Sequence, residues 1–443
     1  MLARRLVVIA AALGLAAGTA TSAASKPAAP ASKREAPEKS VPRSPPIAFF
    51  LAKGDANACG IGCSEWIAAD GAIDSGADLR LRALLKKLGG RKLPIFFHSP
   101  GGAVPTGLAI GRLLRQHGLT AGVGWTVPAG CDPKQQNEPA CDKLKRSGRD
   151  LVAVLDTGRT MCNSSCAFAL VGAAVREVGA GVGLGVHSSS VSFLLKRIDG
   201  AGHVTITPTQ VAPKVEHKAL ENVYVTIASY LREMDISPDL LTAARGVAHN
   251  QLHLLTRDQL VAFGIDRREV VEGMWLFVDG TSGPSALKII EENRAGAFRK
   301  DILRLTCRNA STVQLLYGRD LGFGAASAQA RLSVTASSGS FPLGAPFRAA
   351  ANGTSGPMDV RSVDLPISVL GDASFVIETL DVGAPPVEFG KGTMAGGHLS
   401  VFAKQNASMS KLTVQGAGWG LGELSRHCGT EQPKIKGAPA EQI

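Results

Sequence analysis

The chain has 443 residues, a formal net charge of +11 and eight cysteines. This length is enough for two domains. The basic residues are scattered, without a basic helix and with few aromatic residues between them, so we expect a solvated basic surface and no nucleic-acid partner.

The first 24 residues have the pattern of a secretory signal peptide. Arg4 and Arg5 form a positively charged segment, an apolar run covers 6–17, and small residues follow. The apolar run is short for a transmembrane helix, and no later run approaches that length. We therefore predict a signal peptide over 1–24 and, once it is cleaved, an exported chain with no transmembrane segment. An uncleaved anchor is the alternative.

The next two segments differ in amino-acid composition. Residues 25–46 are rich in Pro, Ala, Lys and Ser, which predicts a disordered linker. The region 47–278 then alternates strand-like and helical runs, which is typical of an α/β layered domain with largely parallel pairing. The expected strands are 65–73, 93–99 and 120–127, and the expected helices are 76–90, 106–118 and 209–234.

A second domain is predicted over 279–430. Short β-type runs separated by Gly, Ser and Pro predict a small β-rich domain with a sandwich-like architecture. Three such runs cover 330–344, 358–383 and 410–424. The last residues, 431–443, form a loose tail.

The cysteines occur in close pairs. In an exported chain such pairs favour disulfides, and their spacing suggests three short loops and one long tie. A zinc site is the competing use, but no Cys-x-x-Cys or His-x-His spacing accompanies the cysteines, so we expect no metal. The suggested pairs are Cys59 with Cys63, Cys131 with Cys141, Cys162 with Cys166, and Cys307 with Cys428.

A first candidate for chemistry is the turn "HSPGG" at 98–102, between an expected strand and an expected helix. Glycine permits positive φ and a close approach of substrate, so backbone N–H groups in such a turn can face an oxyanion. Most Pro-Gly-Gly segments are simple turns, so this feature alone is weak.

The second candidate is "CNSSC" at 162–166, ahead of a helix of small residues. Ser164 at the helix start is either an N-cap or a nucleophile assisted by the helix dipole and by the next N–H. A disulfide across positions i and i+4 is feasible, because their Cα atoms lie about 6 Å apart on a helical turn. A thiol nucleophile is a further alternative.

The third candidate is His187, which follows a short apolar strand. A hydroxyl nucleophile needs a base within hydrogen-bond reach, and His187 is the residue that can supply it. Taken alone, a histidine after a strand is more often a surface or core residue.

The order of these parts resembles the proteolytic subunit of Clp peptidases, within the wider Clp/crotonase fold. The resemblance covers about 65–270 and includes "LHLLTRDQLVAFGID" at 252–266. It implies a layered β-α superhelix in the first domain. The signal peptide, the paired cysteines and the added β domain indicate an exported branch, periplasmic or secreted by a bacterium.

The resemblance also implies roles for individual residues. Ser164 would be the nucleophile and His187 the general base. The N–H groups of Gly102 and Ser165 would form the oxyanion hole, with Gly101 shaping the turn. The family's acid should fall near Leu252, where there is none, so Asn250 is the candidate for the third residue.

Two functions follow as expectations. One is a serine hydrolase, a Clp-like peptidase acting on peptides or unfolded segments, that needs no metal or organic cofactor. The other is a non-catalytic scaffold or binding protein of the cell envelope, which the missing acid favours. The resemblance also implies a homo-oligomer, although the sequence shows no interface.

Overall fold

The computed structural model describes residues 44–428, except 61, 133–137, 199–202, 281–282, 295, 321–330, 337–338, 344–346, 350–357, 372–373, 382–407 and 416–418. The predicted signal peptide, almost all of the predicted linker and the predicted tail lie outside the described residues. Within the described part of the chain, no helix combines the length and the apolar character needed to cross a bilayer.

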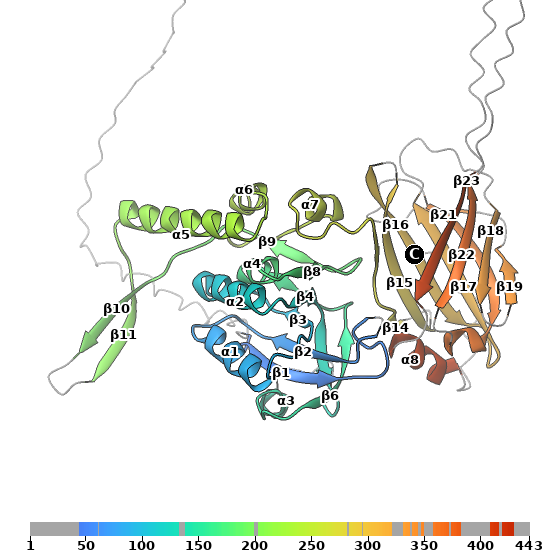
Figure 1. Ribbon diagram of the computed structural model, residues 1–443, viewed down its shortest axis with the longest axis horizontal. Helices are drawn as coiled ribbons and strands as arrows, with labels where there is room; N and C mark the ends of the chain where they lie inside the picture. Colours follow the sequence, from blue (N-terminus) through green and yellow to red (C-terminus); the bar gives the residue numbers. More distant parts are fainter. Residues whose placement is uncertain are drawn as a thin grey trace, which may run out of the picture. The chain divides into compact units, whose positions relative to one another are not determined.

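The first part of the described chain is a mixed α/β structure built on one seven-stranded sheet (Figure 1). The sheet order is β5-β6-β1-β2-β3-β4-β8. Pairings β1–β6, β2–β3, β3–β4 and β4–β8 are parallel, and β1–β2 and β5–β6 are antiparallel. This confirms the predicted α/β class with largely parallel pairing. The strands are β1 (Ala48–Lys53), β2 (Glu65–Asp70), β3 (Ile95–His98), β4 (Thr120–Val123), β5 (Trp125–Pro128), β6 (Leu151–Asp156) and β8 (Val175–Glu177).

Seven helices are described in this part of the chain. Helix α1 buries Ala77, Leu81 and Leu85, one residue per turn, so the apolar spacing in the sequence sets the face that packs on the core. The helices expected at 76–90 and 106–118 are confirmed as α1 and α2. The helices are α1 (Ala77–Lys87), α2 (Val104–Gln116), α3 (Pro139–Lys145), α4 (Ser165–Val171), α5 (Pro213–Glu233), α6 (Asp239–Arg245) and α7 (Arg257–Ala262).

The strand expected over 120–127 is two strands, β4 and β5. They part at Gly124, whose N–H donates to the Phe97 carbonyl over 3.0 Å. Strand β4 pairs with β3, whereas β5 pairs with β6. A Cβ at Gly124 would lie 2.7 Å from Leu155 Cδ1, so glycine avoids displacing the Leu155 side chain where the partner changes.

The helix expected over 209–234 begins later than predicted. Residues up to Thr209 belong to a two-stranded antiparallel hairpin, β10 (Phe193–Ile198) and β11 (Val204–Thr209), which the sequence did not indicate (Figure 1). Helix α5 starts at Pro213, after Ala212 in extended backbone. Proline fits the first helical position because its missing N–H has no partner there in any case.

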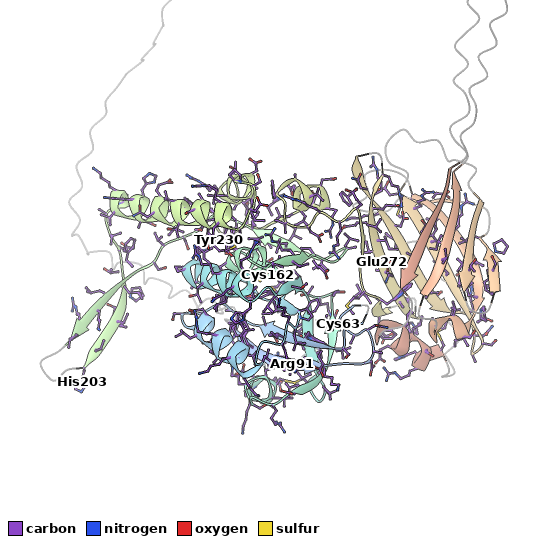
Figure 2. The ribbon with its side chains drawn as sticks, in the orientation of Figure 1. Cys63, Arg91, Cys162, His203, Tyr230 and Glu272 are labelled. Carbon is purple, nitrogen blue, oxygen red and sulfur yellow. A yellow bond between two sulfur atoms is a disulfide. The ribbon has the colours of Figure 1, made fainter. Side chains whose placement is uncertain are left out.

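Close contacts between α2, α4 and α5 form the centre of this core. Tyr230 lies on α5 (Figure 2), and its buried hydroxyl donates to the Phe168 carbonyl over 2.8 Å. Burial raises the pKa of Tyr230, so the hydroxyl stays protonated and remains a donor. Gly111 faces the Tyr230 hydroxyl and Gly172 faces the backbone of Gly111, with no room for a side chain at either position. These contacts fix α4, the helix that follows Ser164.

The second part of the described chain is antiparallel β structure, as predicted. One sheet has the order β13-β15-β16-β17-β21-β20, with β14 also paired to β15, and the other has the order β19-β18-β22-β23. Leu303 and Val334, one from each sheet, belong to a single buried cluster, which fits a sandwich. The strands are β13 (Val270–Glu272), β14 (Leu276–Gly280), β15 (Gly283–Arg294), β16 (Ala297–Cys307), β17 (Thr312–Asp320), β18 (Arg331–Ala336), β19 (Gly339–Pro342), β20 (Phe347–Ala349), β21 (Met358–Pro366), β22 (Ser374–Asp381) and β23 (Ser408–Gln415).

The β-run expected over 410–424 is only partly a strand. Strand β23 ends at Gln415, and a helix, α8 (Trp419–Cys428), follows. Leu421 and Leu424 are fully buried at helical spacing, so burial of one helix face overrides the glycines of this segment. Strand β13 lies before residue 279, strand β14 contains it, and both pair with β15. The domain bounds 47–278 and 279–430 stay predictions.

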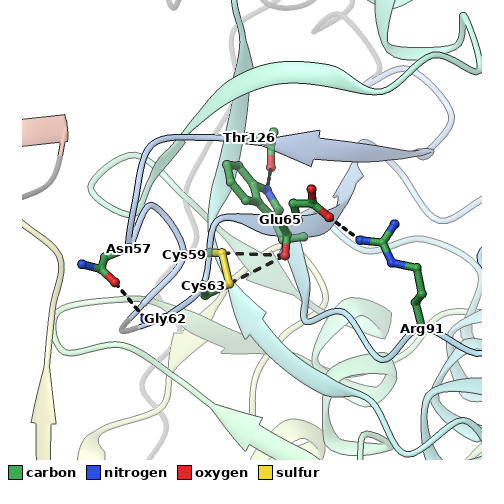
Figure 3. The surroundings of a disulfide bond; sticks show 8 residues. Asn57, Cys59, Gly62, Cys63, Glu65, Arg91 and Thr126 are labelled. Carbon is green, nitrogen blue, oxygen red and sulfur yellow. Dashed lines mark hydrogen bonds and ion pairs between the residues drawn. A yellow bond between two sulfur atoms is a disulfide. The ribbon is translucent and has the colours of Figure 1, made fainter.

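All eight cysteines are paired as their spacing suggested. The Cα separations are 5.1 Å for Cys59–Cys63, 5.7 Å for Cys131–Cys141, 5.2 Å for Cys162–Cys166 and 5.4 Å for Cys307–Cys428. Figure 3 shows the first pair beside the Glu65 carbonyl. No cysteine is therefore left as a zinc ligand or a thiol nucleophile. Four disulfides are typical of a chain that folds in an oxidising compartment.

Candidate active site

The three segments predicted to carry chemistry lie next to one another at their carboxyl ends. Strand β7 (Cys162–Asn163) pairs in parallel with β9 (Leu184–Val186). On its other side, Ser99 forms a parallel bridge with Cys162, and the Asn163 N–H donates to the Ser99 carbonyl over 3.0 Å. Parallel strands deliver their carboxyl ends to one edge of a sheet. The Pro-Gly-Gly turn, Ser164 and His187 therefore follow three neighbouring strand ends.

Ser164 has a backbone conformation that is rare for a residue with a side chain. Its φ is 58° and its ψ is −122°, at the turn between β7 and α4. Its N–H donates to the Gly185 carbonyl over 2.8 Å, which ties the turn to β9. The Ser164 side chain makes no capping hydrogen bond to the helix, although the residue occupies the N-cap position. A capping role therefore does not account for this serine.

The glycine turn lies against Ser164. Gly101 and Gly102 have φ values of 97° and 145°, which other residues rarely adopt. A Cβ on Gly101 would lie 2.5 Å from the Asn163 carbonyl oxygen and 2.7 Å from Ser164 Cβ. The Gly101 N–H donates to Ser99 Oγ over 3.1 Å, which holds the turn in place.

Two backbone N–H groups near Ser164 have no acceptor among the described residues. They belong to Gly102, which is exposed, and to Ser165, the first residue of α4. The Gly101 carbonyl and the Ala103 N–H on either side bond to Ile73, which leaves the intervening N–H of Gly102 unused. Donors of this kind are what an oxyanion hole requires.

His187 follows β9 and is partly exposed. Its Nδ1 lies 2.8 Å from the Ser188 carbonyl oxygen. A carbonyl oxygen only accepts, so Nδ1 carries the proton and, in the neutral ring, Nε2 has the free lone pair of a base. Among the described residues no hydrogen bond joins His187 to Ser164 Oγ. The strand register places Ser164 and His187 near each other. Asn163, the residue before Ser164, pairs with Gly185, which lies two residues before His187.

The position expected for an acid is apolar. Strand β12 (His253–Leu254) pairs with β9 so that His253 is opposite Val186, which places Leu252 beside His187 in the register. Asn250 is exposed, and no hydrogen bond to His187 is found for it within the described part of the chain. Its role as the third residue stays a prediction. The ring of His249, in contrast, contacts His187 edge to face, with centroids 4.9 Å apart.

His98, the first residue of the turn, contacts Trp125 and Thr160 and, among the described residues, neither Ser164 nor His187. Its ring stacks on Trp125 at a centroid distance of 4.9 Å, and its Nδ1 lies 3.4 Å from Thr160 Oγ1. Burial lowers the pKa of His98, so it is neutral at pH 7. Its environment therefore identifies it as a packing residue. The described residues contain no group of three or more His, Cys, Asp or Glu side chains placed to hold a metal ion.

No protein-family model and no curated protein matches the chain. Among solved structures, the chain is similar to a ClpP1 mutant from Listeria monocytogenes, with 12% identity, a TM-score of 0.27, and coverage of 49% of this chain and 88% of that one. It is also similar to a membrane-bound stomatin-specific protease, with 12% identity, a TM-score of 0.27, and coverage of 45% and 75%. At this TM-score the distant likeness carries no inference about activity, which has to come from the geometry of the site.

Proposed function

We propose that the protein is an exported serine hydrolase with a Clp-like first domain, acting on peptides or unfolded protein segments in the periplasm or outside the cell. The observation that carries the proposal is the backbone of Ser164, a serine with positive φ whose side chain does not cap the helix it precedes. Such strain persists only where the surroundings impose it, and it concentrates at functional sites. A serine on a strained strand-to-helix turn presents its hydroxyl outward, as nucleophiles in hydrolases do.

The proposed reaction follows from the groups around this serine. Ser164 Oγ attacks the carbonyl carbon of the scissile bond, and its proton passes to His187 Nε2. The Gly102 and Ser165 N–H groups bond to the oxyanion of the tetrahedral intermediate. His187 then returns the proton to the leaving amine. Water, deprotonated by His187 in turn, hydrolyses the acyl ester and restores Ser164.

Peptides are proposed as substrates because the order of the Ser-Pro-Gly-Gly turn, Ser164 and His187 resembles that of Clp peptidases. The four disulfides support an extracytoplasmic location. Acyl-CoA chemistry, the other large use of this fold, is disfavoured because an exported enzyme does not meet CoA. Assembly into a homo-oligomer belongs to the same proposal.

A non-catalytic scaffold is the second candidate. It is favoured by the absence, among the described residues, of a hydrogen bond between Ser164 and His187 and by the apolar Leu252 in the place of an acid. In this case the glycine turn and the strained serine would be retained parts of the fold, and the β-rich domain would engage a partner.

Labelling with a fluorophosphonate probe, followed by peptide mapping, distinguishes the two. The oxidised protein would be compared with Ser164→Ala, Ser165→Ala and His187→Ala. We expect an adduct on Ser164, none in Ser164→Ala, and labelling slowed by about 100-fold or more in His187→Ala, because a positioned base contributes that much. No adduct on correctly folded protein would refute the hydrolase and leave the scaffold. An adduct on Ser165 would move the nucleophile by one residue.

A further inference from the structure

The carbonyl oxygen of Ser188 is shared by two histidines. His187 Nδ1 lies 2.8 Å from it and His249 Nδ1 lies 2.9 Å from it. A carbonyl oxygen has two lone pairs and no proton to give, so both ring nitrogens act as donors. The two imidazoles are therefore held with their Nδ1–H groups directed at one point.

The ring of His249 is itself held in this state. Its Nε2 lies 3.2 Å from Ser190 Oγ. Since Nδ1 carries the proton of the neutral ring, Nε2 accepts from the serine hydroxyl. The Ser188 N–H donates to the Val247 carbonyl over 2.9 Å, which ties the segment after His187 to the segment before His249. Every polar atom of the His249 ring thus has a partner.

We propose that the Ser188 carbonyl and His249 together replace the missing acid, with His249 as a positioning residue for His187. The inference rests on the proposed function. It assigns to the Ser188 carbonyl and His249 the role that the acid has in a Ser-His-Asp triad. The carbonyl fixes the Nδ1–H tautomer of His187, leaving Nε2 as the base. The His249 ring, packed on the His187 ring with an interplanar angle of 68°, restricts rotation of that base.

This arrangement explains why no carboxylate is needed to orient His187. An acid orients a catalytic histidine by accepting from the ring nitrogen that faces away from the nucleophile. The Ser188 carbonyl accepts from that same nitrogen, and the His249 N–H holds the carbonyl in place. A neutral carbonyl stabilises the imidazolium less than a carboxylate does, so we expect a slow hydrolase.

The test measures two quantities separately, the tautomer of His187 and the reactivity of Ser164. Histidine ring nitrogens labelled with ¹⁵N report the tautomer of His187 by NMR, with the signal assigned from His187→Ala. The variants are His249→Ala, which removes the donor, and His249→Asn, whose amide can occupy the place of Nδ1–H. His249 is exposed, so neither variant should unfold the protein. The control is His217→Ala, an exposed histidine on α5.

We expect wild type to show the Nδ1–H tautomer of His187, and His249→Ala to show a mixture with the Nε2–H form. Fluorophosphonate labelling of Ser164 should slow by about 10-fold to 100-fold in His249→Ala, because a displacement of about 1 Å has effects of this order. His249→Asn should recover most of the rate, and the control should leave both readouts unchanged.

The proposal is overturned if the His187 tautomer is the same in wild type and His249→Ala, whatever happens to the labelling rate. A wild-type protein that does not react at Ser164 contradicts the proposed function instead. In that case the NMR comparison still decides whether His249 fixes the tautomer of His187, so the two failures are distinguishable.

Discussion

Ser164 differs from the other residues that have positive φ. Among the described residues other than glycine, only Asn57 at 64°, Ser164 at 58° and Asp235 at 54° have such values. Asn and Asp enter this half of the map more readily than other residues, because their short polar side chains bond locally. Ser164 combines positive φ with a ψ of −122°, which lies outside the left-handed helical region. This conformation sets Ser164 apart from Asn57 and Asp235 and supports its proposed role as the nucleophile.

This strain predicts a conflict between stability and reactivity at one residue. Ser164→Gly should raise the free energy of unfolding by about 1 kcal/mol, because glycine removes the backbone strain at a smaller cost in chain entropy. The same substitution should abolish fluorophosphonate labelling. Denaturant unfolding of the oxidised protein measures the first effect.

The matched control is Ser164→Ala, which also lacks the hydroxyl but keeps a Cβ. It should lose labelling without becoming more stable. If Ser164→Gly is no more stable than Ser164→Ala, the strain assigned to this turn is absent.

At the scale of elements, the disulfide Cys162–Cys166 encloses the strained turn. It joins the start of β7 to the second residue of α4, and both cysteines are fully buried. Ser164 lies midway in this loop, between an anchored strand and an anchored helix. The bond therefore limits how far the turn can relax toward an ordinary backbone conformation.

We predict that the double variant Cys162→Ala/Cys166→Ala loses both stability and reactivity at Ser164. A loop of this length should contribute about 2 kcal/mol by restricting the unfolded chain. Without it the turn can relax, so labelling should slow by about 10-fold or more. Denaturant unfolding and the labelling rate are measured on the same samples.

The chain supplies its own control in Cys59–Cys63, which has the same sequence separation of 4. Cys59→Ala/Cys63→Ala should lose a similar amount of stability and keep the labelling rate. Equal loss of reactivity in both double variants would mean that the effect is general destabilisation.

Some helices and strands can be predicted from the sequence and others cannot. Helices α1 and α2 were predicted because their apolar residues repeat at helical spacing. The hairpin β10–β11 was missed because most of its side chains are exposed, including Leu194 and Ile206, so no buried face marks it. Helix α8 was missed because its glycines indicate turns, and only burial of Leu421 and Leu424 in the core specifies a helix.

The candidate site shows the same limit. The order of the glycine turn, Ser164 and His187 is visible in the sequence, because the turn and His187 each follow an apolar run and Ser164 precedes an apolar helix of small residues. The link between His249 and Ser188 was not, since it depends on how two distant loops meet. The sequence contains only the signal that "HNQLH" at 249–253 offers two histidines and two amide side chains where an acid is expected.

At the scale of the whole molecule, a buried charge cluster joins elements from the α/β part to the β-rich part. Arg257, at the start of α7, donates to Asp266 over 3.0 Å and to Glu291 on β15 over 2.8 Å. Arg268 also donates to Asp266 over 2.6 Å. Removing one member of such a cluster leaves a buried charge with too few partners.

Asp266 predicts the behaviour of the protein in acid. Burial alone would raise the pKa of Asp266, but the hydrogen bond and charge of Arg268 and the charge of Arg257 outweigh it and hold this pKa below the usual value. A carboxyl with a lowered folded pKa contributes stability that is complete above the unfolded pKa, about 3.9, and is lost as pH falls through the folded pKa. The free energy of unfolding should therefore decline below about pH 4.

Asp266→Asn separates this carboxyl from the others. At pH 7 it should lower the free energy of unfolding by about 3 kcal/mol, the cost of breaking a buried ion pair. Below about pH 4 its stability should fall less steeply with pH than that of wild type, because one fewer proton is taken up on unfolding. Asp279→Asn, an exposed position on β14, is the control and should keep both the stability and the slope. Parallel pH profiles of wild type and Asp266→Asn would show that the folded pKa of Asp266 is not lowered, and acid unfolding would then have to begin at other carboxyls.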